Sequence, residues 1–138
     1  MNESLFRLEM QVRDYECDLQ GIVNNAVYQH YLEHARHEFL HACGFDFAEL
    51  TAQGIHLVVV RAELDYRRPL RPGDRFTVDV RCESLGRVRQ VFLQSIVRAD
   101  GTPILDARIV WTALDAQGRP RMPAGLLEKV MPGNREKE

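Results

Sequence analysis

Apolar side chains between residues 24 and 43 recur with the spacing of a helix. Five of them fall on one face at intervals of four, three, four and three: Tyr28, Leu32, Ala35, Phe39 and Ala42. Such a stripe is typical of a helix that packs against a core along one side. Asn24 or Asn25 can cap its first turn, and Gly44 can end it in a left-handed conformation. At about 1.5 Å per residue, the predicted helix is roughly 30 Å long.

The remaining apolar positions favour extended chain. Strands are predicted at 5–13, 56–66, 75–85, 88–99 and 103–115, and short helices at 46–53 and 122–130. The alternation expected of half-buried antiparallel strands is clearest in two groups, Phe76, Val78 and Val80, and Val91 and Leu93. Proline and glycine break the chain after the second strand, and Asp100-Gly101 is a strong hairpin signal.

The order of elements is a strand, a long helix and four further strands joined largely by tight turns. Neither an amphipathic helix nor a sheet with one apolar face is stable without cover. The economical solution is an α+β hotdog domain, in which a five-stranded antiparallel sheet wraps around the helix. We expect residues 1–138 to form this single domain, with 132–138 as a frayed tail.

Composition narrows the functional class. The net charge is −2, and the basic residues are sixteen Arg and two Lys, so no basic face for nucleic acid is expected. The three cysteines are widely spaced, which is typical of free thiols in a reducing compartment. No apolar segment has the length of a signal core or a membrane span. A cytoplasmic protein is expected.

The predicted helix contains a literal HExxH motif, His37-Glu38-Phe39-Leu40-His41. In zinc proteases this spacing places two imidazoles on one helix face, with the Glu as general base. Four histidines form a stripe opposite the apolar one: His30, His34, His37 and His41. A solvated or subunit-facing polar stripe explains them equally, and no clear third ligand is present. We expect no metal and keep a zinc hydrolase as an alternative.

Asp18 stands six or seven residues before the predicted helix start, with Gly21 between them. A helix N-terminus presents unpaired N–H groups and a positive dipole end, which suit a developing oxyanion. Asp18 can fold back to face those groups through a turn at Gly21. The alternatives are a solvated loop acid or a helix cap.

The run VRDYECDLQGIVNNAVYQHYLEHARHEFL resembles the opening signature of the 4-hydroxybenzoyl-CoA thioesterase-like hotdog family. The matching positions are Asp18, Gly21-Ile22-Val23, Tyr28 and the segment 31–38, and the resemblance extends over about residues 5–130. The motif VNNAVY is similar to that of plant acyl-lipid thioesterases of the methylketone-synthase type, which act on thioesters of acyl carrier protein. In the Tol–Pal-associated branch a His occupies the position of Asn25, so a substrate range like that branch's is not implied.

The resemblance implies an acyl thioesterase without a cofactor, acting on an acyl-CoA or an acyl carrier protein thioester. Asp18 aligns with the catalytic carboxylate, as general base or nucleophile, and the backbone N–H of Asn25 aligns with the donor to the thioester carbonyl. Expulsion of a thiolate, whose acid has a pKa near about 8.5, needs no strong general acid. Substrate-binding residues are expected at Gly21, Val23, Asn24, Tyr28, Tyr31, Arg87 and Arg89.

Two further expectations concern partners. Arg67, Arg68 and Arg71 flank the proline turn and are candidates for carrier phosphates, as are Arg87 and Arg89. Open sheet edges favour self-association, and the resemblance implies a dimer or a dimer of dimers with sites at the subunit interface. A hotdog module that binds acyl groups without turnover remains the non-enzymatic alternative.

Overall fold

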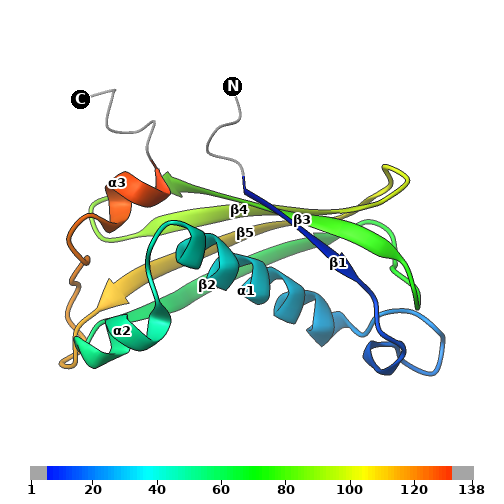
Figure 1. Ribbon diagram of the computed structural model, residues 1–138, viewed down its shortest axis with the longest axis horizontal. Coiled ribbons are helices and arrows are strands. Elements are labelled where there is room, and N and C mark those ends of the chain that lie inside the picture. Colours follow the sequence, from blue (N-terminus) through cyan, green and yellow to red (C-terminus); the bar gives the residue numbers. More distant parts are fainter. Residues whose placement is uncertain (1–5, 132–138) are drawn as a thin grey trace.

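One five-stranded antiparallel sheet forms the body of the molecule (Figure 1), in a computed structural model that describes residues 6–131. The strands are β1 (Phe6–Gln11), β2 (His56–Tyr66), β3 (Arg75–Ser84), β4 (Gln90–Arg98) and β5 (Pro103–Leu114). Their order across the sheet is β1-β3-β4-β5-β2, and every neighbouring pair is antiparallel. The predicted hotdog architecture is confirmed, while the predicted tail 132–138 lies outside the described residues.

Helix α1 (Asn25–Ala42) lies across the concave side of the sheet (Figure 1). The side chain of Asn24 caps it by accepting the N–H of Ala26 at 2.9 Å, and Gly44 ends it with φ +94°. Its buried residues are Tyr28, Tyr31, Leu32, Ala35, Phe39 and Leu40. The prediction was wrong for Ala42, which is exposed. Because the sheet curves around the helix, Tyr31 and Leu40 widen the buried stripe instead.

The core lies between α1 and the sheet. Phe76, Val78 and Val80 of β3 are buried there, as predicted. In β4 the core contains Phe92 and Ile96, whereas Val91 is buried outside the main core cluster. Val91 and Leu93 do alternate as predicted, but they lie on the face of β4 that points away from α1. Periodicity alone cannot tell the two faces of a strand apart when both are apolar.

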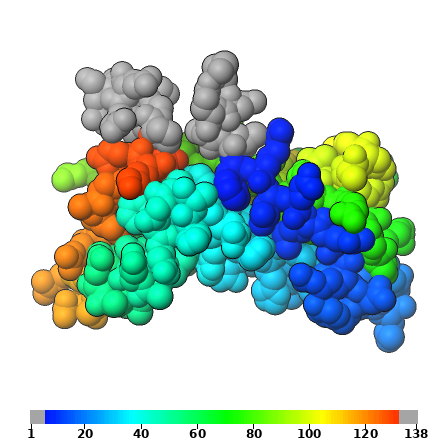
Figure 2. Space-filling view, in the orientation of Figure 1, coloured from blue at the N-terminus to red at the C-terminus, as the bar shows by residue number. Residues whose placement is uncertain are grey.

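Short helices close the two ends of the sheet. At one end lie α2 (Phe47–Ala52) and α3 (Leu126–Val130), and at the other lies the 3₁₀ turn η1 (Asp14–Glu16), beside the first turn of α1 (Figure 1). In the space-filling view, α1 forms the middle of the face between α2 and the β1 end (Figure 2). The loop 12–24 that carries Asp18 thus belongs to the end opposite α2 and α3.

Strand β2 is an open edge of the sheet. Val59 and Val60 are neighbours there, and they are 45% and 43% exposed. Val60 is the extra residue of a β-bulge, because Val59 pairs with Trp111 and Arg61 with Val110. Exposed valines on the outer, unpaired edge of a strand favour pairing with a strand of another chain. None of the helices within residues 6–131 combines the length and the apolarity needed to cross a bilayer.

Candidate active site

Asp18 opens a tight turn that its own backbone and side chain close. Its N–H donates to the carbonyl of Ile22 at 2.9 Å, and its carbonyl accepts the N–H of Gly21 at 3.0 Å. Its Oδ1 accepts the N–H of Gln20 at 2.9 Å. Gly21 has φ +78°, which favours glycine because it has no Cβ. Asp18 is exposed, and within the described chain its Oδ2 has no hydrogen-bond partner. One carboxylate oxygen therefore serves the turn, and the other is unpaired among the described residues.

The turn is tied directly to the start of α1. The N–H of Asn24 donates to the carbonyl of Glu16 at 3.1 Å, and the N–H of Val23 donates to the carbonyl of Leu70 at 2.9 Å. Cys17 and Val23 form an isolated antiparallel bridge on either side of the turn. The chain therefore folds back just before α1, and the Asp18 turn lies between the two bonded segments. Asp18 itself is not among the residues that line the cleft at the start of α1.

A partly buried hydrogen bond anchors the segment before Asp18. The Tyr31 hydroxyl donates to Oε1 of Glu16 at 2.7 Å, and the N–H of Arg13 donates to the same oxygen at 2.8 Å. Burial raises the pKa of Tyr31, and the Glu16 carboxylate raises it further. The Tyr31 ring packs on Phe76 at a centroid distance of 4.8 Å. Tyr31 was expected to bind substrate. In the structure its side chain lies in the core and supports the segment before the Asp18 turn through Glu16.

The N-terminus of α1 offers a free donor. The side-chain oxygen of Asn24 accepts the N–H of Ala26, whereas the N–H of Asn25 has no acceptor among the described residues. Asn25 is exposed, so its N–H can reach a ligand. The positive end of the helix dipole adds to the attraction for an oxyanion at this point.

A cleft of about 240 Å³ opens beside this donor. It is lined by Ile22, Val23, Asn25, Tyr28, Tyr66, Arg67, Arg68 and Pro69. Val23 and Tyr28 form its buried floor, and the Tyr28 hydroxyl accepts the N–H of Leu70 at 2.9 Å. Burial raises the pKa of Tyr28, and the Leu70 N–H partly opposes that shift.

Tyr66 is the wall residue that the sequence analysis missed. Its ring packs against that of Tyr28 in a T-shaped arrangement with a centroid distance of 5.6 Å, and Tyr66 is 49% exposed. Its place at the end of a strand, just before two arginines and a proline, was the available signal. Arg67 and Arg68 also reach this cleft, and Arg67 forms an ion pair with Asp106 at 2.7 Å.

Arg87 and Arg89 lie at the other end of the molecule. They belong to the turn between β3 and β4, whereas the Asp18 loop joins the sheet where β3 begins, since the N–H of Val12 donates to the carbonyl of Asp74. A ten-residue strand spans about 30 Å. Within one protomer, therefore, these arginines do not meet the cleft.

The histidine stripe of α1 faces outward, and His30, His34, His37 and His41 are all exposed. The His37 ring lies 4.1 Å from that of Phe47, and its Nε2 is 3.8 Å from a carboxylate oxygen of Glu33. Burial against Phe47 lowers the pKa of His37. Within residues 6–131, no group of three or more His, Cys, Asp or Glu side chains lies close enough together to hold a metal ion.

Comparison with known proteins identifies the family. The family model of the thioesterase-like superfamily matches residues 12–130. The chain is 38% identical over 126 residues to the chloroplastic acyl-acyl carrier protein thioesterase ATL3 of Arabidopsis thaliana, covering 90% of this chain and 66% of that protein. It thus spans slightly less than two thirds of that relative's length.

Two further relatives match most of their own length. The acyl-CoA thioester hydrolase YbgC of Escherichia coli is 30% identical over 115 residues, covering 83% of this chain and 86% of that protein. A solved structure of a hypothetical protein from Aquifex aeolicus superposes with a TM-score of 0.85 at 30% identity, covering 91% of this chain and 98% of that one. The chain belongs to the thioesterase-like superfamily.

Proposed function

We propose that the protein hydrolyses acyl thioesters, with Asp18 as the reacting carboxylate and the N–H of Asn25 as the oxyanion donor. The observation that supports this proposal is the fold-back of the loop before α1, in which Cys17 bridges Val23 and the N–H of Asn24 donates to Glu16. One short loop thus carries both a carboxylate oxygen and an N–H that have no partner among the described residues. The superfamily match supports the same chemistry.

Two routes to the free acid fit these groups. In the first, Asp18 takes a proton from water while the water oxygen bonds to the thioester carbon; the C–S bond then breaks, and the thiolate leaves and is protonated. In the second, Oδ2 itself attacks the carbon, the thiolate leaves, and water hydrolyses the anhydride. In either route the carbonyl oxygen gains charge near the N–H of Asn25, a kind of donor worth about 2.7–4 kcal/mol of barrier in other enzymes.

A single turnover in H₂¹⁸O, with enzyme in excess, separates these routes. Direct attack leaves the label in the Asp18 carboxylate, if water attacks the carbonyl carbon derived from Asp18, or in the product acid, if it attacks the acyl carbon. The general-base route places the label only in the product. Mass spectrometry of the Asp18 peptide therefore detects the anhydride route when the carboxylate becomes labelled.

Relatives named for acyl carrier protein and for CoA suggest a carrier that ends in phosphopantetheine. The Arg68 side chain at the cleft fits its phosphate, because a guanidinium group binds phosphate through two parallel N–H bonds. Arg67, whose Nε and Nη2 contact Asp106, adds positive charge beside it. We therefore place the thiol end of the carrier in the cleft that Arg67 and Arg68 line. Relative kcat/KM for one acyl group on the two carriers decides which carrier is preferred.

A second copy of the chain completes the site in this proposal. Asp18 and Asn25 are exposed in one protomer, whereas an oxyanion hole is most effective where water is excluded. Two β2 edges paired antiparallel about a two-fold axis bring the α2 end of one protomer toward the Asp18 end of the other. Arg87 and Arg89 of the second copy then approach the carrier side. Light scattering showing a stable, active monomer would contradict this arrangement.

The test of the reaction is the substitution Asp18→Asn, measured on a panel of acyl-CoA and acyl carrier protein thioesters. It keeps the size and the turn-forming acceptor and removes the negative charge. Turnover should fall by about 10²–10⁴-fold. The matched control is Asp14→Asn, an exposed acid of the same loop that should keep wild-type kcat. An Asp18→Asn protein with wild-type kcat would remove Asp18 from the chemistry, and a wild-type protein inactive on the whole panel would favour acyl binding without turnover.

A further inference from the structure

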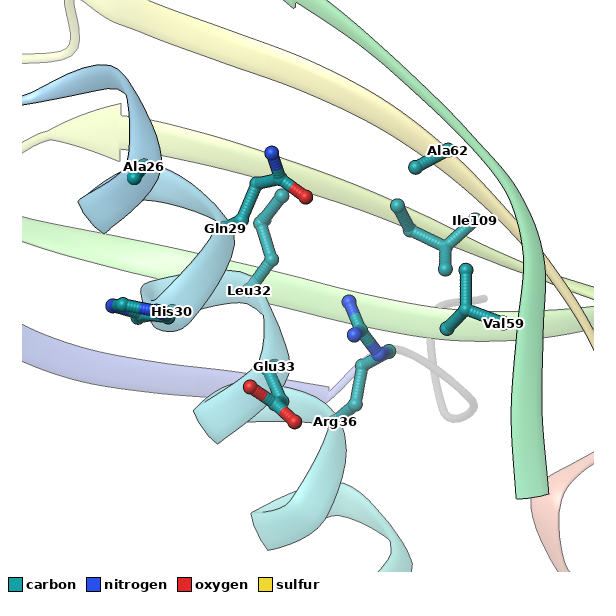
Figure 3. Close-up of a pocket in the computed structure, with 9 residues that line it drawn as sticks. All are labelled: Ala26, Gln29, His30, Leu32, Glu33, Arg36, Val59, Ala62 and Ile109. Carbon is teal, nitrogen blue, oxygen red and sulfur yellow. The ribbon is translucent and has the colours of Figure 1, made fainter. Parts of the chain in front are cut away.

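A second hollow, of about 340 Å³, lies between α1 and the strands β2 and β5 (Figure 3). The strand side is apolar, with Val59, Ala62 and Ile109, and the helix side includes the charged residues Glu33 and Arg36. The hollow shares no lining residue with the cleft at the start of α1. It is therefore a separate surface, which the proposed chemistry does not use.

The hollow borders the outer edge of the sheet. Among the described strands β2 pairs only with β5, so the N–H and C=O groups along its other edge are unpaired. Val59, which lines the hollow, is 45% exposed, and its neighbour Val60 is 43% exposed. An exposed apolar strand edge favours association with another chain.

Arg36 brings an uncompensated positive charge to the hollow. Its Nη1 donates to Oε1 of Gln94 at 3.0 Å, and Gln94 is 3% exposed, so the guanidinium is held in place from the core. None of the ion pairs among residues 6–131 includes Arg36. Burial lowers the pKa of Arg36. A cation held beside an apolar wall is costly unless an anion accompanies it.

Glu33 brings the opposite charge to the same hollow. Its carboxylate turns away from the Arg36 guanidinium in Figure 3, and in the described chain its one ion pair is a contact of 3.8 Å with Nε2 of His37. That contact is an ion pair only when His37 is protonated, and burial lowers the pKa of His37. The Glu33 side chain is 55% exposed, so its carboxylate can reach a group outside the protomer.

A two-fold axis can join these two charges. In an isologous contact, residue i of one copy meets residue j of the other, and j meets i. Two antiparallel α1 helices centred between residues 34 and 35 place Glu33 against Arg36 of the second copy and repeat the contact with the roles exchanged. Val59 and Ala62, which line the hollow with these charges, lie on either side of the middle of β2. One axis therefore serves both the strand pair and the helix pair.

We propose that the hollow is an interface between two copies of the chain, held by two reciprocal ion pairs between Glu33 and Arg36 across the axis. Beside its bond to Gln94, each guanidinium keeps enough N–H groups for a paired bond to a carboxylate. Association removes the exposed valines of β2 and the hollow from water, so the charges meet where solvent screens them weakly. This inference rests on the second copy proposed above and not on the chemistry assigned to Asp18.

The experiment uses the reciprocity of the pairs and measures dimer Kd by sedimentation velocity. Glu33→Arg leaves only positive charge at the axis, and Arg36→Glu leaves only negative charge. Each variant alone should therefore have a dimer Kd raised by about a hundredfold or more. An equimolar mixture of the two variants restores opposite charges across the axis and should form a heterodimer. The control Glu38→Arg makes the same charge change at an exposed position of α1 outside the hollow, and it should keep the wild-type Kd.

The outcomes are distinct. Equal dimer Kd values for wild type and Glu33→Arg would overturn the ion pairs, as would an equal loss of dimer in Glu33→Arg and Glu38→Arg. A mixture of the two folded variants that stays monomeric would do the same. A monomeric wild type would overturn both this interface and the second copy at the proposed site, whereas thioester turnover tests Asp18 separately. If circular dichroism shows that Arg36→Glu does not fold without its bond to Gln94, the comparison of Glu33→Arg with Glu38→Arg decides alone.

Discussion

The hydrogen bond between Tyr31 and Glu16 offers a sharp test of how the Asp18 loop is held. The substitution Tyr31→Phe removes only the hydroxyl, which donates to Glu16 at 2.7 Å, and keeps the ring on Phe76. Tyr31 is 2% exposed, and the Glu16 side chain is 11% exposed. Hydrogen bonds to charged groups are worth about 1.5–3 kcal/mol. Because Arg13 still binds the Glu16 carboxylate in the variant, we expect the free energy of unfolding to fall by about 1.5 kcal/mol.

The assay is chemical and thermal denaturation of four proteins: wild type, Tyr31→Phe, Glu16→Gln and the double variant. For a chain of this size the single change should lower Tm by roughly 4–8 °C. The coupling energy of the cycle should exceed about 0.5 kcal/mol, because the two groups are in contact. Tyr15→Phe is the matched control, since Tyr15 is 80% exposed and its hydroxyl removal should change stability by less than about 0.5 kcal/mol.

The pH dependence has a definite sign. Burial and Glu16 raise the pKa of Tyr31 in the folded protein above the unfolded value of 10.0. The neutral phenol therefore stabilises the fold fully below that pH, and the contribution is lost as the pH rises above it. The stability gap between wild type and Tyr31→Phe should narrow in alkaline buffer. A gap that widens, or a cycle with no coupling, would refute this account of the loop.

Further predictions concern the turn, the cleft, the core and the edge. Gly21→Ala should cost about 1 kcal/mol or more and reduce turnover, because φ is +78° there; melts and kcat check it. Tyr28→Phe should cost about 1–3 kcal/mol in denaturant melts, since it leaves the buried N–H of Leu70 without its acceptor. Burial raises the pKa of Cys82 to about 12. The Cys82 thiol should therefore resist iodoacetamide at neutral pH until the protein unfolds. The stability that the neutral thiol contributes should be lost as the pH rises from about 9 toward 12. Val60→Lys should shift the light-scattering mass toward a monomer, and an unchanged mass would argue against pairing through β2.

The positions of helix and strands followed from local chemistry. The 3.6-residue period of α1, the alternation of β3 and the glycine and proline turns fixed these elements to within a few residues. The position of Asn24 at the helix start and of Gly44 at its end also followed, because capping depends on neighbouring residues. The fold-back of the loop before the helix could be predicted for the same reason, since only a short turn separates Cys17 from Val23.

Contacts between distant segments were decided by the tertiary structure. The links of Tyr31 to Glu16 and Arg36 to Gln94 depend on how the helix is rotated over the sheet, and an apolar stripe defines that rotation only coarsely. The same rotation left Ala42 exposed and buried Leu40. Arg87 and Arg89 could be assigned to a turn from the sequence, but their separation from the cleft required the length and direction of β3. The sequence thus determined which elements form, because those preferences are local, and the packing of α1 on the sheet determined which side chains meet.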